Sequence, residues 1–430
     1  MTRQSSLALA RLGLPALPLA FVALPLYMVW PHHVATNFGL SLGLLGGLLF
    51  VVRLLDGLLD PLIGHAVDGL LVKGAATLLR RCLLAGMVLA LSFIWLFFPQ
   101  WLLGPTLTMD ALLVLMTVLL LCAYLAYSFL NIALQAWGAG IAGDSTERSR
   151  LVGWREGLGL LGVISASVLP GLWGLPVLVT VFVLLLALGL FFWRRVARSA
   201  LACTPEVVSG HAVGSLWQPW QHAGFRRLLQ VFMRNGIASA VPATLILFFV
   251  QDRLQMSNAQ TTVFVAAYFI AAALSMPLWL RAMARWGLRR CWLWGMGLAI
   301  AVFIWTLALT AGDELSFLTI CLLSGVALGS DLIAPGALLN GLLQRPDAQS
   351  SPPGAYFGWW QVASKFNLAL AAGVSLPLLQ ALGYSAGAQD APALLALSLA
   401  YGLLPCLLKA AAWWLLYKSP SHFNAAEVHP

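Results

Sequence analysis

The chain has 430 residues, of which 61% are hydrophobic and only 9% are charged. A water-soluble domain carries about 25% charged residues, because its surface must be hydrated. Apolar runs near or above about 18 residues recur along the whole chain, and each is long enough to cross a hydrocarbon layer of about 30 Å. The composition therefore excludes a soluble protein and predicts an all-α polytopic membrane protein.

The net charge of +9 does not indicate nucleic-acid binding, because the cations lie in short turns between apolar runs and form no basic runs with aromatic residues. The six cysteines are scattered and form no CxxC pair, so we expect neither a disulfide framework nor a cysteine metal site. The sequence contains no Walker or HExxH pattern. We therefore expect no enzymatic activity and no cofactor.

The apolar runs predict twelve membrane spans. In chain order these are residues 12–35, 41–68, 82–104, 110–142, 151–172, 175–197, 226–251, 258–282, 291–311, 316–343, 355–382 and 391–417. A polar interval at residues 200–225 separates an N-terminal six-helix bundle, residues 1–199, from a C-terminal one, residues 226–430. The turns after the second and eighth spans are both basic, which favours two related halves, as in many transporters.

Lysine and arginine are distributed unequally between the two sides of the predicted membrane. One set of loops carries almost all of them, and the other set carries only Arg253. Cytoplasmic loops are the ones rich in lysine and arginine, so both termini are expected in the cytoplasm. The expected location is the bacterial inner membrane. An even number of spans agrees with that orientation.

Two aspartates lie well inside the second span. Arg53, Asp56, Asp60 and Gly64 step by three and four residues, which places them on one face of a helix. Two carboxylates one turn apart, roughly 6 Å, repel each other in a medium of low dielectric constant, so the pair tends to hold a proton or a small hard cation. A salt bridge with Arg53 that only fixes helix packing is the alternative. One cation beside two acids, with Pro61 next to them, favours the functional interpretation.

A stripe of polar residues runs along one face of the fourth span. Tyr124, Tyr127, Ser128, Asn131 and Gln135 recur at helical spacing on an otherwise apolar helix. Such a stripe either lines a substrate cavity or bonds across a helix interface, and the spacing favours neither.

Further polar residues lie at depth in the C-terminal half. Lys365, near Trp359 and Gln361 in the eleventh span, is about 15 Å from the span end by helix rise, so we expect it to have a carboxylate partner. Asp331 in the tenth span is at similar depth. For Arg234 and Lys409, nearer to span ends, we expect side chains that extend to the membrane surface.

The second-span string Arg53-x-x-Asp56-x-x-x-Asp60-Pro61-x-x-Gly64 resembles the signature of the glycoside–pentoside–hexuronide:cation symporters, which belong to the major facilitator superfamily. Three segments support the resemblance. They are Tyr27-Met28 with Gly39-Leu40-Ser41, Glu147-Arg148-x-Arg150-Leu151 with Arg155, and Gly354 to Lys365.

The resemblance implies a major facilitator fold and roles for individual residues. Asp56 and Asp60 would bind the coupling H⁺ or Na⁺, as metal ligands only if the ion is Na⁺, and Lys365 would join the charge network. Arg155 would bind substrate. Two acidic residues of the family's pattern are absent. Ala20 occupies the position of the acid in the first helix and Asn131 the position of the acid in the fourth helix, and Gln135 replaces an aromatic residue.

These observations predict a cation-coupled symporter of a small organic solute, such as a sugar or glycoside, with H⁺ favoured over Na⁺. Asp56, Asp60 and Asn131 would form the ion site, and Arg53, Asp331 and Lys365 the charge network. The predicted substrate-binding residues are Tyr27, Tyr124, Tyr127, Gln135, Arg155, Trp359 and Gln361. We expect a monomer whose partners are a small-molecule substrate and membrane lipids. A carrier of lysolipids or other amphipathic molecules, and a non-transporting sensor or scaffold on the same fold, are the alternatives.

Overall fold

The structure is a computed structural model that describes residues 6–30, 33–34, 42–103, 109–141, 145–203, 215–344, 353–384 and 389–419. Every regular element within these residues is a helix. The chain divides into two compact units, each of which is described by itself. Unit 1 comprises Met1–Gly143, Arg150–Gln221 and Leu343–Val362, and unit 2 comprises Asp144–Ser149, His222–Leu342 and Ala363–Pro430.

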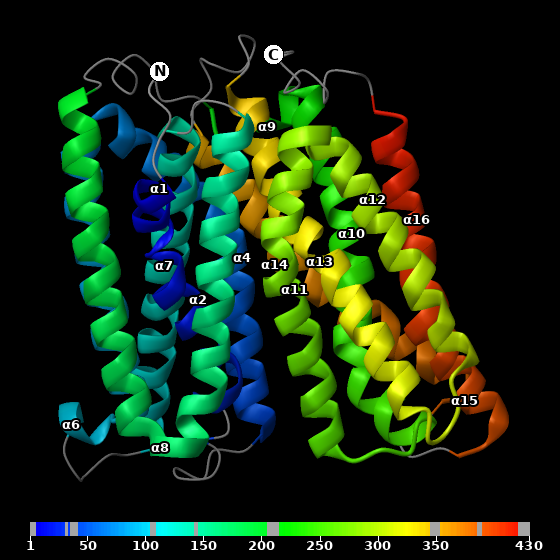
Figure 1. The fold of residues 1–430 in the computed structure, drawn as a ribbon. Coiled ribbons are helices and arrows are strands. Elements are labelled where there is room, and N and C mark those ends of the chain that lie inside the picture. The colour runs from blue at the N-terminus through cyan, green and yellow to red at the C-terminus, as the bar shows by residue number, and fades with distance from the viewer. Residues whose placement is uncertain are drawn as a thin grey trace. The chain divides into compact units, whose positions relative to one another are not determined.

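Unit 1 contains the helices coloured blue to green at the start of the chain (Figure 1) and the first turns of α14. Its elements are α1 (Ser6–Gly13), α2 (Ala16–Leu24), the π-helical turn η1 (Pro25–Val29), α4 (Leu42–Val72), α5 (Ala75–Phe97), α6 (Gln100–Leu103), α7 (Met109–Ile141), α8 (Ser145–Cys203) and α9 (Gln218–Gln221). Helix α7 packs against both α4 and α5. Because α4 and α7 are neighbours, the acid pair and the polar stripe predicted from the sequence lie on adjacent helices.

Unit 2 contains the helices coloured green to red (Figure 1). Its elements are α10 (Ala223–Phe248), η2 (Phe249–Arg253), α11 (Asn258–Trp286), α12 (Leu288–Phe303), η3 (Ile304–Ala308), α13 (Glu314–Leu343), most of α14 (Pro353–Ala381), α15 (Ala391–Ser398), η4 (Leu399–Leu403) and α16 (Leu404–Tyr417). Helix α16 packs against α10 and α12. An aromatic core, in which Phe249 stacks on Tyr401 with ring centroids 4.1 Å apart, closes one end of the unit.

Within the described residues, each predicted span overlaps a helix or consecutive helical segments. The fifth and sixth spans both lie within α8, on either side of Gly174, whose φ of 76° and ψ of 178° break the helical conformation. Only glycine adopts that combination without strain. Among the described residues, eight helices are long and apolar enough to cross a membrane.

The predicted bounds of the third span, residues 82–104, are wrong by about two turns. Helix α5 begins at Ala75, directly after Gly74, and ends at Phe97. Gly74 has a φ of 102°, which separates α4 from α5 in a tight turn and places Arg80 and Arg81 inside the helix. At the other end, Pro99 disfavours the helical conformation of the residue before it.

In unit 1, α4 and the start of α14 approach each other backbone to backbone. A methyl group on Gly64 would collide with the main-chain carbonyl of Gly354, and a Cβ on Gly358 would lie 2.7 Å from the carbonyl oxygen of Asp60. Neither neighbouring atom belongs to a side chain that can move aside. Glycine at these positions therefore sets the distance between the two helices.

Asp68, one turn beyond Gly64 on α4, fixes the first turn of α14. Its carboxylate accepts hydrogen bonds from the main-chain N–H groups of Gly354 and Ala355, the latter at 2.8 Å. A carboxylate at a helix N-terminus satisfies N–H groups that have no partner within the helix and opposes the positive end of the helix dipole. The sequence analysis gave Asp68 no role.

We predict that Gly64→Ala and Gly358→Ala each destabilise the protein. Overpacking of a tight contact costs about 1–3 kcal/mol, so the midpoint of thermal unfolding in detergent should fall. Gly297→Ala on α12 is the matched control, because a Cβ there meets nothing within 4 Å. Equal unfolding midpoints for Gly64→Ala and Gly297→Ala would contradict the close approach of α4 and α14.

Candidate functional site

The acid pair of α4 is buried. Asp56 is 3% exposed and Asp60 is 0% exposed, so neither carboxylate is bathed by solvent. The hydroxyl of Ser128 on α7 donates a hydrogen bond of 2.9 Å to Asp56 Oδ1. The second and fourth predicted spans thus meet at the acid pair, and Ser128 is the member of the polar stripe that bonds to it.

The C-terminal part of the polar stripe on α7 forms a hydrogen bond within its own helix. Gln135 Nε2 donates to Asn131 Oδ1 at 3.1 Å, so the two amides that stand one turn apart bind each other. Gln135 is 6% exposed. The amide oxygen of Asn131, which the sequence analysis assigned to the ion site, is therefore already an acceptor of a hydrogen bond.

A third carboxylate lies near the acid pair. The charged and polar groups that act on the hydroxyl of Tyr127 are Asp56 and Asp60 on α4, Glu156 on α8 and Tyr124 on α7. Asp56, Asp60 and Glu156 therefore lie near enough to Tyr127 for their charges to act on its hydroxyl. Glu156 was not predicted from the sequence, because consecutive residues of a helix are not expected to meet.

Arg155, predicted to bind substrate, forms an ion pair with Glu156. Its Nε and Nη2 donate to Glu156 Oε1 at 3.2 and 2.9 Å. The side chains are 16% and 30% exposed, respectively, and are thus more accessible than the acid pair. An ion pair directed at hydrocarbon would be costly, so the accessible side of this pair belongs to a polar space.

The remaining predicted residues of unit 1 have different surroundings. Trp359 Nε1 donates to the carbonyl oxygen of Leu216 at 3.1 Å, and its ring packs against Trp217 and Trp220 just before and within α9. Gln361 is half-buried on α14 and Arg53 is exposed on α4. The side chain of Tyr27 lies outside the described part of the structure. Among the described residues, no three His, Cys, Asp or Glu side chains are grouped to hold a metal ion.

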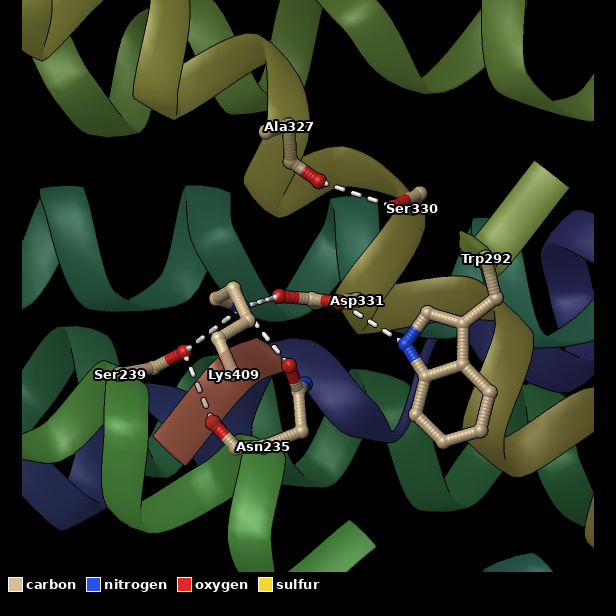
Figure 2. Close-up of polar contacts among 7 residues, drawn as sticks. All are labelled: Asn235, Ser239, Trp292, Ala327, Ser330, Asp331 and Lys409. Atoms are coloured by element: carbon tan, nitrogen blue, oxygen red, sulfur yellow. Dashed lines mark hydrogen bonds and ion pairs between the residues drawn. The ribbon is translucent and has the colours of Figure 1, made fainter. Parts of the chain in front are cut away.

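Unit 2 contains a separate buried ion pair, shown in Figure 2. Lys409 Nζ on α16 lies 2.7 Å from Asp331 Oδ2 on α13 and also donates to Asn235 Oδ1 at 2.7 Å and Ser239 Oγ at 3.5 Å. Asp331 Oδ1 accepts a hydrogen bond of 2.8 Å from Trp292 Nε1. All three protons of the ammonium group and both carboxylate oxygens are engaged, so the network is closed and connects α10, α12, α13 and α16.

This network corrects two expectations. Lys409 does not extend to the membrane surface, because its carboxylate partner lies on a neighbouring helix. Asp331 bonds to Lys409 and Trp292 and not to Lys365. Lys365 is half-buried on α14, and its place in a charge network with Arg53 stays a prediction. The spacing of Asn235 and Ser239, one turn apart on α10, was the available sequence signal for the network.

Comparison with known proteins identifies the family of the chain. Residues 12–420 match the family described as MFS/sugar transport protein. The chain belongs to this family. The prediction of a major facilitator fold is thereby confirmed, and so is the expectation of a multi-pass membrane transporter rather than an enzyme.

Individual relatives are distant. The putative glycoside/cation symporter YagG of Escherichia coli strain K12 is 30% identical over 133 residues, which span 30% of this chain and only 27% of that protein's length. Among solved structures, a bacterial homologue of the iron transporter ferroportin superimposes with a TM-score of 0.69 at 16% identity, covering 95% of this chain and 98% of that chain. The E. coli fucose:proton symporter FucP superimposes with a TM-score of 0.59 at 12% identity, covering 96% and 97%. These similarities show the fold.

We predict that Lys409→Met destabilises unit 2 by about 3–5 kcal/mol, because it leaves the Asp331 charge buried and unpaired. Adding Asp331→Asn removes that charge and should restore most of the loss. The measurement is thermal unfolding of the single and double variants in detergent, with Lys418→Met, at an exposed lysine of the same chain end, as control. A double variant no more stable than Lys409→Met would disprove the pairing, and Asp331→Asn should give no rescue of Lys365→Ala.

Proposed function

We propose that the protein is a symporter that couples proton movement to the transport of a small hydroxylated solute of the sugar or glycoside type, by alternating access. The buried acid pair carries the proposal. In the middle of unit 1, the described carboxylates Asp56, Asp60 and Glu156 exceed the guanidinium groups of Arg53 and Arg155 by one. One monovalent cation neutralises the excess, which suits a coupling-ion site.

Two features of the site favour a proton over Na⁺ as the coupling ion. A Na⁺ ion requires several oxygen ligands, and the amide oxygen of Asn131 already accepts a hydrogen bond from Gln135. The helical backbone around the acid pair keeps its carbonyl oxygens in its own hydrogen bonds, except that of Gly57, whose helical donor is replaced by Pro61. A proton, by contrast, needs only one carboxylate oxygen.

The substrate class is supported by the relatives. One is named as a putative glycoside/cation symporter and another as a fucose:proton symporter. The accessible ion pair of Arg155 and Glu156 offers hydrogen-bond donors and acceptors side by side, which suits neighbouring hydroxyl groups. A lysolipid carrier and a non-transporting sensor are the competing functions, and a single uptake screen separates all three.

The screen measures uptake into proteoliposomes with labelled monosaccharides, glycosides and a lysophosphatidylcholine, each with and without an inward pH gradient and with and without Na⁺. The proposal expects accumulation of one of the sugars or glycosides driven by the pH gradient. Accumulation of the lysolipid alone would identify the amphipathic carrier. Lack of uptake for the whole panel, together with unchanged internal pH, would favour the sensor.

We predict that Asp60→Asn abolishes accumulation against a gradient while exchange of substrate across the membrane is less affected. The reason is that an amide cannot take up the coupling proton, whereas the substrate contacts remain. Glu314→Gln, at an exposed carboxylate of α13, is the control and should accumulate substrate normally. Concentrative uptake by Asp60→Asn would show that the acid pair is not the coupling site.

We predict further that uptake by the unmodified protein is nearly indifferent to Na⁺ at constant pH, and that Asn131→Asp increases the response to Na⁺. The new carboxylate would supply an anionic oxygen one turn from Ser128, which bonds to Asp56, where the amide oxygen already accepts a hydrogen bond from Gln135. The measurement is the initial uptake rate as a function of Na⁺ concentration. Strong Na⁺ stimulation of the unmodified protein would overturn the choice of the proton.

A further inference from the structure

Arg155 and Glu156 are consecutive residues of α8, yet they form an ion pair. Consecutive side chains of an α-helix do not face each other, so each must bend toward the other for the contact to form. Both nitrogens of Arg155 that take part reach the same carboxylate oxygen, Glu156 Oε1. Two parallel bonds to two oxygens would be the stronger arrangement for an arginine and a carboxylate. The pair is therefore one that a better-placed acceptor displaces.

Glu156 is one of four ionisable groups that act on Tyr127. From α4 and α7 the ionisable groups around Tyr127, which Glu156 also approaches, are Asp56, Asp60 and Tyr124. None of these is a cation, so the only described positive charge bonded to Glu156 is that of Arg155.

On its other side this part of α8 packs against α1 and α2 through small residues. A Cβ on Gly13 would lie 3.1 Å from the main-chain nitrogen of Arg155, and a Cβ on Gly159 would lie 3.5 Å from the methyl group of Ala20. These neighbours carry no titratable group. Glu156 stands one turn before Gly159, so on this side α8 packs against α2 through a glycine and an alanine.

We propose that the Arg155–Glu156 pair links substrate binding to proton binding: acceptor groups of the substrate take over the guanidinium of Arg155, and the released carboxylate of Glu156 takes up a proton. The inference rests on the proposed function, because it concerns the same transport site. The hydrogen bonds from Arg155 to Glu156 break and equivalent bonds from Arg155 to substrate oxygens form. One proton passes from water to a carboxylate oxygen of Glu156, and no covalent bond of the substrate changes.

The electrostatics give the exchange its direction. While Arg155 holds Glu156, the carboxylate is stabilised as an anion by an opposite charge at 2.9 Å. When the substrate occupies Arg155, Glu156 loses the cation that is bonded to it, and loss of a counter-charge favours the protonated acid. The linkage is reciprocal, so protonation of Glu156 frees Arg155 and increases the affinity for substrate.

The test needs no substrate, because Arg155→Gln imitates an arginine that has left Glu156. Infrared spectra of the purified full-length protein in lipid nanodiscs at neutral pH report the carbonyl stretch of protonated carboxyl groups. We expect Arg155→Gln to gain a band worth about one protonated carboxyl per molecule, since loss of the counter-charge favours the acid. The double variant Arg155→Gln/Glu156→Gln should lose that band. Arg194→Gln, at an exposed arginine of the same helix, is the matched control and should resemble the unmodified protein.

Two results would overturn the inference. In the first, folded Arg155→Gln shows no additional protonated carboxyl. In the second, the band persists in the double variant, which places the proton on Asp56 or Asp60. Should Arg155→Gln fail to fold, Arg155→Lys keeps a positive charge but loses the two-nitrogen contact, and the Glu156 band should then appear at a higher pH than in the unmodified protein. A band that appears at the same pH in both would equally disprove the linkage.

The outcome is distinguishable from failure of the proposed function. Uptake that ignores the pH gradient would reject the proton symporter, while the infrared result would still show whether Glu156 titrates with Arg155. Conversely, proton-driven uptake by Glu156→Gln with an unchanged dependence on pH would retain the symporter and reject Glu156 as its link to the substrate.

Discussion

A charge placed at membrane depth must find its partner within the protein, because hydrocarbon offers neither water nor counter-ions. Three aspartates among the described residues illustrate that constraint. Asp68 uses the N–H groups of a helix N-terminus, Asp331 uses a lysine and an indole, and Asp56 uses a serine hydroxyl. How completely each group is satisfied separates the structural contacts from the ones able to change state.

By that measure the two units differ in chemistry. The network around Lys409 is closed, since each ammonium proton and each carboxylate oxygen has a partner, and a closed network stabilises one arrangement of helices. In unit 1 the charges of three carboxylates act on Tyr127, and part of the Arg155–Glu156 pair is accessible. An incompletely neutralised group responds to a proton or a solute, whereas a closed one resists both. We therefore place the proposed transport chemistry in unit 1. The Lys409 network stabilises the helices of unit 2.

The sequence predicts features that depend on spacing along one helix. The apolar runs gave the membrane helices, and the steps of three and four residues placed Asp56 and Asp60 on one face of α4. It did not predict the partner of Lys409, which lies 78 residues away on another helix, because packing between helices decides that contact. It also gave no reason to pair Arg155 with Glu156, since the spacing rule for helices says that consecutive residues do not meet. The shifted start of α5 has a local cause in Gly74, whose positive φ the apolar pattern does not register.

The position of Arg155 and Glu156 on a single helix has a mechanical consequence. An ion pair between helices, such as Lys409 with Asp331, is strained or broken whenever the helices slide or tilt, so it senses movement. Two consecutive residues travel together through any rigid-body motion, and their separation is set by the backbone that joins them. Motion of the helix therefore does not break such a pair, whereas a molecule that competes for one of its partners does. The pair can respond to bound substrate in every conformation of a transport cycle.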